Sequence, residues 1–207
     1  MGDYKIFANH AHVFPKGSKD NAQIENLKEL MEKCGIEGAV CFAPFNHQTE
    51  RVGIKINQNK WLYEEIKNEK NLIGFGTINF DIGSIQNQVK EIKELGFKGI
   101  KIHPAAQEVK VDGRELFEVY AEAEKQGLFL SFHTGLHWHR IKEYSMLLFD
   151  EVAYNFPKLK FSMEHVGGYS FFKEALLVMN NNERKGNNIY AGLTSISMEE
   201  DALGNLR

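Results

Sequence analysis

The feature that most constrains the fold is a repeat of short segments rich in β-branched and aromatic residues. Their centres follow one another at steps of roughly 30 residues, which is the length of one strand and its crossover helix. Strands that alternate with helices in this way form a parallel sheet with the helices packed against it. Seven segments fit the pattern: Tyr4–Ala8, Gly38–Phe42, Leu72–Asn79, Phe97–Ile102, Leu128–Phe132, Leu159–Met163 and Asn188–Leu193.

The segments between these strands carry apolar residues at helical spacing. The clearest stripe runs from Ile24 to Cys34, and Gly35 provides a stop signal directly after it. Further helices are expected at 85–95, 116–123, 141–155 and 171–179.

A parallel sheet of this kind is either open and doubly wound or closed into a (β/α) TIM-type barrel. A barrel requires eight strands, and the observed spacing would centre the eighth near residue ~220. The chain has 207 residues. Either the sheet has seven strands or the barrel is incomplete, so the motifs at the strand ends have to decide between the two.

The first strand ends in an HxH motif formed by His10 and His12. Residues two apart in a strand share a face, so both imidazoles project in the same direction, which suits two ligands on one divalent ion. The pattern is short and common, and two solvated histidines at a polar strand end would satisfy it equally well.

Three further histidines follow strands: His103 after the fourth, His133 after the fifth and His165 after the sixth. Each of them alone could be a core histidine bonded to a carbonyl. The carboxyl ends of parallel strands meet at one rim, where barrel enzymes keep their chemistry. Neutral imidazole is a common ligand of zinc and related ions, so together the histidines predict a metal centre.

In their order and spacing these motifs resemble the amidohydrolase superfamily, in particular its amidohydrolase-related (amidohydrolase 2) group. The resemblance implies a (β/α) TIM-type barrel of the metal-dependent hydrolase type, with a single domain over residues 1–207 that is truncated after strand seven. The matching motifs are His10-Ala11-His12, Gly99-Ile100-Lys101-Ile102-His103-Pro104, Phe132-His133-Thr134-Gly135 and Glu164-His165-Val166-Gly167-Gly168.

Carried over to this sequence, the family pattern makes His10, His12 and His133 the ligands of one divalent metal ion, most often zinc. His165 would be the catalytic residue that activates or orients the metal-bound water, or polarises a substrate carbonyl. Three neutral nitrogens keep such an ion strongly Lewis acidic and lower the pKa of its water toward ~7.

The family also uses an Asp at the end of strand eight, and this chain has no eighth strand. An incomplete chain would explain the difference. The alternative is a complete protein whose tail supplies a carboxylate in its place. The local candidates are Glu199, Glu200 and Asp201, although three successive acids are more typical of a solvated face or a helix N-terminus.

Four residues are candidates for substrate binding. Lys101 could bind a substrate carboxylate, form a structural ion pair inside the barrel, or be carbamylated, as in some amidohydrolase subgroups. His103 could contact the substrate, or it could form a hydrogen bond to a metal ligand and so orient that ligand. His137 and His139 flank Trp138 in the loop after strand five, which favours a substrate-facing or lid surface over a second metal site.

Composition and charge limit the classes of partner that we expect. With 28 acidic and 25 basic residues the net charge is −3, which provides no electrostatic reason to expect nucleic acid or an anionic membrane as a partner. Cys34 and Cys41 form neither a CxxC motif nor a disulfide framework, and this is typical of the reducing cytoplasm. We therefore expect a cytoplasmic protein that acts on a small molecule.

Three functions remain open. The first is metal-dependent hydrolysis of an amide, lactone or related carbonyl bond of a small molecule through a metal-bound hydroxide. The second is metal-dependent, non-oxidative decarboxylation of an aromatic or enoic acid by the same ligands. The third is a catalytically inactive, truncated barrel, whose open strand edges would favour self-association into a homo-oligomer.

Overall fold

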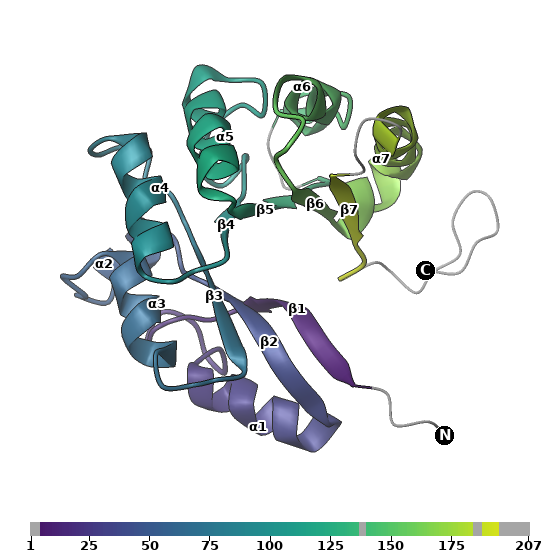
Figure 1. The fold of residues 1–207 in the computed structure, drawn as a ribbon. Coiled ribbons are helices and arrows are strands. Elements are labelled where there is room, and N and C mark those ends of the chain that lie inside the picture. The colour runs from purple at the N-terminus through teal and green to yellow at the C-terminus, as the bar shows by residue number, and fades with distance from the viewer. Residues whose placement is uncertain (1–4, 137–139, 184–187, 195–207) are drawn as a thin grey trace. The chain divides into compact units, whose positions relative to one another are not determined.

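The computed structural model describes residues 5–136, 140–183 and 188–194 of the chain (Figure 1). Strands and helices alternate along it, and the described residues contain seven strands, as the spacing predicts. The chain divides into two compact units, residues 1–101 and 102–207. Each unit has its own parallel strands and helices.

The first unit is built on parallel strands whose order follows the chain. They are β1 (Ile6–His12), β2 (Ile36–Phe42), β3 (Leu72–Gly76) and β4 (Gly99–Ile102). Its helices are α1 (Ile24–Cys34), α2 (Asn46–Glu50), α3 (Gln58–Ile66) and α4 (Ile85–Glu94). Phe42 pairs with His12 on one side and with Phe75 on the other. Paired residues of parallel strands point to the same face, so these three rings lie on one face of the sheet.

The second unit repeats the same plan. Its elements are α5 (Arg114–Gln126), β5 (Phe129–His133), the 3-10 helix η1 (Ile141–Tyr144), α6 (Leu148–Asn155), β6 (Phe161–Glu164), the 3-10 helix η2 (His165–Gly167), α7 (Gly168–Asn182) and β7 (Ile189–Gly192). Strand β6 pairs in parallel with β5 and with β7.

An aromatic core covers one face of β5 and β6. Phe132 makes edge-on ring contacts with Phe149 of α6 and Phe161 of β6, with centroids 5.1 and 5.7 Å apart. The ring of Tyr120 from α5 joins them at 5.8 Å from Phe132. Because side chains alternate along a strand, this core turns His133 to the opposite face.

Several predicted elements differ in their bounds from the structure. The first strand, expected at Tyr4–Ala8, is observed at Ile6–His12 and so includes both histidines of the HxH motif. The third strand was expected to continue to Asn79 but ends at Gly76. The side-chain amide of Asn59 bonds both backbone groups of Thr77, at 2.8 and 2.9 Å, and thereby occupies the positions that a neighbouring strand would use. The helix expected at 141–155 is split into η1 and α6. Between them Ser145 leaves the helical conformation, with φ −56° and ψ 124°, and the backbone N–H of Met146 donates to the Glu174 carboxylate at 3.4 Å.

Helix α2 was not expected from the pattern, and α3 was not marked by an apolar stripe. Helix α3 begins at Asn57, whose side chain accepts a hydrogen bond from the N–H of Lys60. Its buried face includes Gln58 and Asn59 beside Trp61. A face on which amides are buried lacks the apolar stripe that reveals a helix in the sequence.

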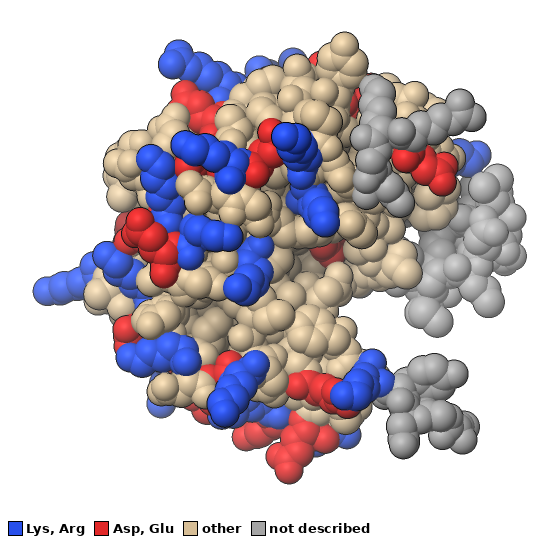
Figure 2. Space-filling model, in the orientation of Figure 1, with Lys and Arg blue, Asp and Glu red and all other residues tan. Residues whose placement is uncertain are grey.

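On the face shown in Figure 2, basic and acidic side chains are interspersed. Pairs such as Lys28 with Glu69 and Lys60 with Glu91 lie 2.6 and 3.0 Å apart. Within the described ranges, no helix is both long enough and apolar enough to cross a membrane.

Candidate functional site

Strand β1 carries both histidines of the HxH motif on one face. The Nε2 atoms of His10 and His12 lie 3.1 Å apart. The register of β1 against β2 shifts between Ala8 and Ala11, where β1 holds one extra residue. Such a β-bulge twists a strand locally and redirects the side chains beside it, and His10 lies within this one.

This separation suits a metal-binding pair. Two nitrogens with bonds of ~2.1 Å to one ion would subtend an angle of ~95° at a separation of about 3.1 Å. The same distance also permits a hydrogen bond between the rings when one Nε2 carries a proton. In both cases the two Nε2 atoms converge on one point. The pair therefore fits the histidine part of the predicted metal site.

The ring of Phe42 forms the floor beneath this pair. Its centroid lies 4.7 Å from that of His10 and 5.1 Å from that of His12, both edge-on. The Nζ of Lys101 lies over the same ring at 4.8 Å, and this side chain is only 1% exposed. A buried ammonium group thus lies over an aromatic face, on the same side of the sheet as two imidazoles.

The second unit gathers the other three strand-end histidines. The rings of His103 and His133 are stacked, with centroids 3.8 Å apart and planes only 9° apart. The ring of His165 meets that of His133 edge-on at 4.8 Å. The prediction that these strand ends bring their histidines together is therefore confirmed within this unit.

Hydrogen bonds assign different tautomers to two of these rings. The Nδ1 of His103 accepts from the N–H of Ala106 at 3.3 Å, so in the neutral ring the proton is on Nε2, which then donates. The Nδ1 of His165 lies 2.5 Å from the carbonyl oxygen of Thr194. A carbonyl only accepts, so this Nδ1 carries the proton and Nε2 keeps its lone pair. His165 is thus arranged to accept a proton at Nε2, and His103 to donate a hydrogen bond through its Nε2–H.

Glu164 is a site residue that the sequence interpretation missed. It pairs with His133 in the register of β5 and β6 and is only 1% exposed. One carboxylate oxygen accepts hydrogen bonds from the hydroxyls of Ser131 at 3.1 Å and Ser162 at 2.5 Å. On β7 only glycine fits beside it, because a Cβ at Gly192 would lie 2.0 Å from its second oxygen. Strand parity places these polar residues on the face opposite the aromatic core, but the contact between Ser131 and Glu164 depends on the register of β5 and β6.

The backbone that carries His165 is strained. His165 and Val166 have φ values of 65° and 47°, in the left-handed region. Such a conformation costs of order 1–3 kcal/mol for a residue other than glycine, most of all for a β-branched one. Val166 is 1% exposed, so its surroundings hold it in place. Strain of this kind concentrates at functional sites.

The remaining predicted site residues are placed as follows. His10 and His12 belong to the first unit and His133 to the second. Within the part of the chain that is described, no three His, Cys, Asp or Glu side chains gather into an ion site, so the three-histidine centre stays a prediction. Five candidates lie outside the described residues: His137, His139, Glu199, Glu200 and Asp201.

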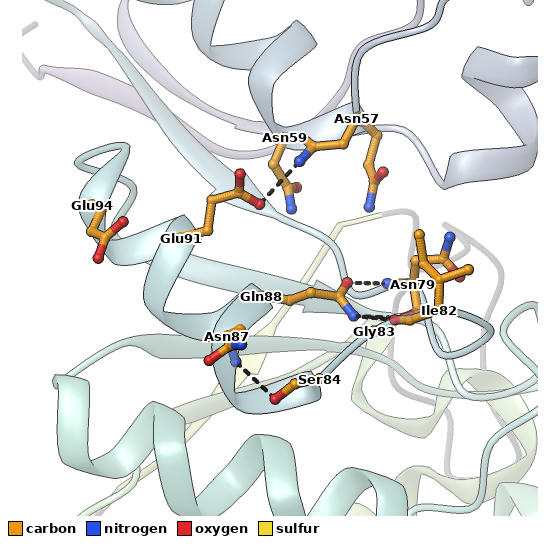
Figure 3. A pocket seen from close by; sticks show the side chains of 11 residues that line it. Asn57, Asn59, Asn79, Ile82, Gly83, Ser84, Asn87, Gln88, Glu91 and Glu94 are labelled. Atoms are coloured by element: carbon orange, nitrogen blue, oxygen red, sulfur yellow. Dashed lines mark hydrogen bonds between the residues drawn. The ribbon is translucent and has the colours of Figure 1, made fainter.

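A polar groove of about 480 Å³ between α3, α4 and the loop after β3 contains none of the predicted site residues (Figure 3). Its side-chain amides hold that loop. Gln88 donates to the carbonyls of Asn79 and Ile82, at 2.8 and 3.0 Å, and accepts from the N–H of Asn79 at 2.9 Å. The groove is therefore explained as a structural feature of the first unit.

The family model described as amidohydrolase (Amidohydro_2) matches residues 21–183. The chain belongs to the amidohydrolase family. Members of this family are typically metal-dependent enzymes. In this amidohydrolase the matched range contains His103, His133 and His165, whereas His10 and His12 lie before it.

Solved structures of similar fold cover most of this amidohydrolase. An uncharacterised TIM-barrel protein from Bordetella bronchiseptica is 20% identical with a TM-score of 0.71, over 92% of this chain and 75% of its own. A probable 2-pyrone-4,6-dicarboxylic acid hydrolase from Acinetobacter baumannii, with citric acid bound, is 12% identical with a TM-score of 0.65, over 93% and 71%.

A third structure, 5-carboxyvanillate decarboxylase from Sphingomonas paucimobilis, is 16% identical with a TM-score of 0.60, over 79% of this chain and 68% of its own. No curated protein matches the chain. Likenesses at these identities establish the fold. It is the (β/α) TIM-type barrel fold, of which this chain contributes seven described strands.

Proposed function

We propose that this amidohydrolase is a metal-dependent hydrolase of an amide, lactone or related carbonyl bond in a small molecule. The ligands of its one divalent ion, with zinc as the first candidate, would be His10, His12 and His133. The observation that carries the proposal is the convergence of the two Nε2 atoms of the HxH motif at 3.1 Å. Family membership supports it, because most members depend on a metal.

A bound ion would supply Lewis acidity, polarising the substrate carbonyl and lowering the pKa of water. The other roles belong to the protein. His165 takes the proton at Nε2, since its Nδ1 donates to the carbonyl of Thr194. The Nε2–H of His103 donates to an oxygen of the substrate, and Lys101 binds its anionic group. His137 and His139 would contribute from the loop after β5.

The decarboxylase is the second candidate. The buried cation of Lys101 over Phe42 would bind the carboxylate of an aromatic acid. It would bind a carboxylate carried by a lactone substrate equally well, so it supports both candidates. The similar structures include both a decarboxylase and a hydrolase. The proposal also includes a single domain over residues 1–207 and a small molecule as the partner. It further includes a cytoplasmic location, with which the two free cysteines agree.

The test is metal content measured together with turnover. The purified chain is loaded with zinc, dialysed and assayed for metal, for hydrolysis of simple lactones and amides, and for release of CO₂ from aromatic acids. We expect stoichiometric zinc, which His12→Ala loses and the control His47→Ala keeps. Release of CO₂ without hydrolysis would favour the decarboxylase. Retained zinc without any turnover would favour the inactive barrel. If His12→Ala kept its zinc, the ligand assignment would be wrong.

A further inference from the structure

The backbone that carries His165 is clasped by one hydroxyl group of the neighbouring strand end. The Oγ1 of Thr134, directly after β5, donates to the carbonyl of Glu164 at 2.5 Å and accepts from the N–H of Gly167 at 2.8 Å. These two backbone groups flank His165 and Val166, the two left-handed residues of the turn. We propose that Thr134 is a positioning residue, whose hydroxyl holds this turn and thereby sets the orientation of the His165 ring.

Two features make the hydroxyl hard to replace. Thr134 is 3% exposed and Val166 is 1% exposed, so water has little access to the backbone groups that the hydroxyl bonds. A backbone N–H or carbonyl that loses its partner in such surroundings destabilises the fold. Without the hydroxyl, the left-handed conformation of Val166 would lose the contact that compensates for its strain.

The residue after Thr134 completes the clasp. Gly135 packs so closely on the turn that a Cβ there would lie 3.2 Å from the carbonyl carbon and oxygen of Gly167. Its φ of 92° is itself in the region that favours glycine. The Thr-Gly pair after β5 therefore holds the turn after β6 by two hydrogen bonds and by close backbone packing.

The ring of His165 has a separate anchor. Its Nδ1 donates to the carbonyl of Thr194 at 2.5 Å, and that bond selects the tautomer with the lone pair on Nε2. In the structure the ring reaches Thr194 from the left-handed backbone that Thr134 holds. Loss of the Thr134 hydroxyl should therefore change the tautomer of His165, a consequence that an ordinary buried hydrogen bond elsewhere would not have.

The first experiment reads the tautomer directly. Histidine labelled with ¹⁵N reports which ring nitrogen carries the proton, and spectra recorded over a pH series identify the neutral form of the ring. Thr134→Val removes the hydroxyl at nearly constant shape, and Thr134→Ser retains it. We expect the wild type and Thr134→Ser to show the Nδ1–H form of His165, and Thr134→Val to lose it in favour of a mixture. An unchanged His165 signal in folded Thr134→Val would overturn the proposal.

The second experiment is a double-mutant cycle with Val166→Gly, which relieves the left-handed strain. Thr134→Val should lower the folding equilibrium constant about tenfold in the wild-type background, and by a clearly smaller factor in the Val166→Gly background. Equal losses in the two backgrounds would contradict the proposal. If Thr134→Val alone does not fold, the double variant decides. If the double variant folds, the result supports the clasp. If the double variant does not fold although Val166→Gly alone does, the result contradicts the clasp.

Only the catalytic consequence of this positioning rests on the proposed function. Neither experiment uses turnover or a bound metal, so a chain without hydrolase activity would leave the inference intact. Conversely, an active enzyme whose His165 tautomer ignored Thr134→Val would overturn the positioning role and leave the proposed hydrolase standing.

Discussion

Replacing Tyr120 by Phe removes one hydroxyl from the interior of the second unit. The Tyr120 side chain is fully buried, and its hydroxyl donates to the carbonyl of Val111 at 2.9 Å. Its ring packs on Phe132, the residue before His133. The substitution keeps the ring and leaves a buried carbonyl without its donor. A loss of this kind lowers the free energy of unfolding by about 1–3 kcal/mol at pH 7.

The size of this loss should depend on pH, and the sign follows from burial. Desolvation, with a smaller contribution from the charge of Asp112, raises the pKa of Tyr120 well above its usual value. The unfolded chain releases the proton near pH ~10 and the folded chain does so only at a higher pH. The stabilisation is therefore fully present below pH ~10 and declines above it, by about 1.4 kcal/mol for each pH unit.

Urea unfolding at pH 7, 9 and 11 measures both effects. The difference between the wild type and Tyr120→Phe should be similar at pH 7 and 9 and clearly smaller at pH 11, because the unfolded chain has then lost a proton that the folded chain still holds. Tyr154 is 66% exposed, so the control Tyr154→Phe should change the free energy of unfolding by less than about 0.5 kcal/mol throughout. A difference for Tyr120→Phe that stays constant up to pH 11 would refute the reasoning.

Three further outcomes are expected. In the native protein a thiol reagent should modify exposed Cys34 and spare Cys41, because burial raises the pKa of the Cys41 thiol to about 12; two rapid equivalents before unfolding would contradict this. Gly192→Ala should lower the free energy of unfolding by about 1–3 kcal/mol, since its Cβ would lie 2.0 Å from the Glu164 carboxylate; an unchanged melting temperature would argue against that contact. Gln88→Ala should cost about 1–3 kcal/mol by freeing loop carbonyls after β3 without altering zinc retention, and loss of zinc would show that the loop supports the metal site.

Much of the fold could be predicted because its signals are local. The apolar stripe from Ile24 to Cys34 coincides with α1, which ends at Gly35 in the left-handed conformation. Each predicted strand corresponds to an observed one. The predicted bounds were wrong where polar side chains form hydrogen bonds that a neighbouring strand would otherwise form. The side chain of Asn59 bonds the backbone of Thr77, and β3 ends just before it. Buried amides lie outside the hydrophobic pattern on which the prediction depends.

The candidate site could be predicted only in part. Parity along a strand correctly places His10 and His12 on one face, because that relation involves two positions of one segment. The role of Glu164 needs the register between two strands, and the clasp formed by Thr134 needs contacts 30 and 33 residues away along the chain. No local pattern carries such information.

The alternation of strands and helices, and the histidines near the strand ends, can be deduced from the amino-acid sequence. Both follow from the periodicity of single segments and from the conformational preferences of residues such as glycine and proline. The nitrogen of His165 that carries the proton depends on packing, because its partner, the carbonyl of Thr194, lies just after β7 and 29 residues further along the chain. Hydrogen-bond direction and strain depend on atoms that packing brings together, and a local pattern does not contain them.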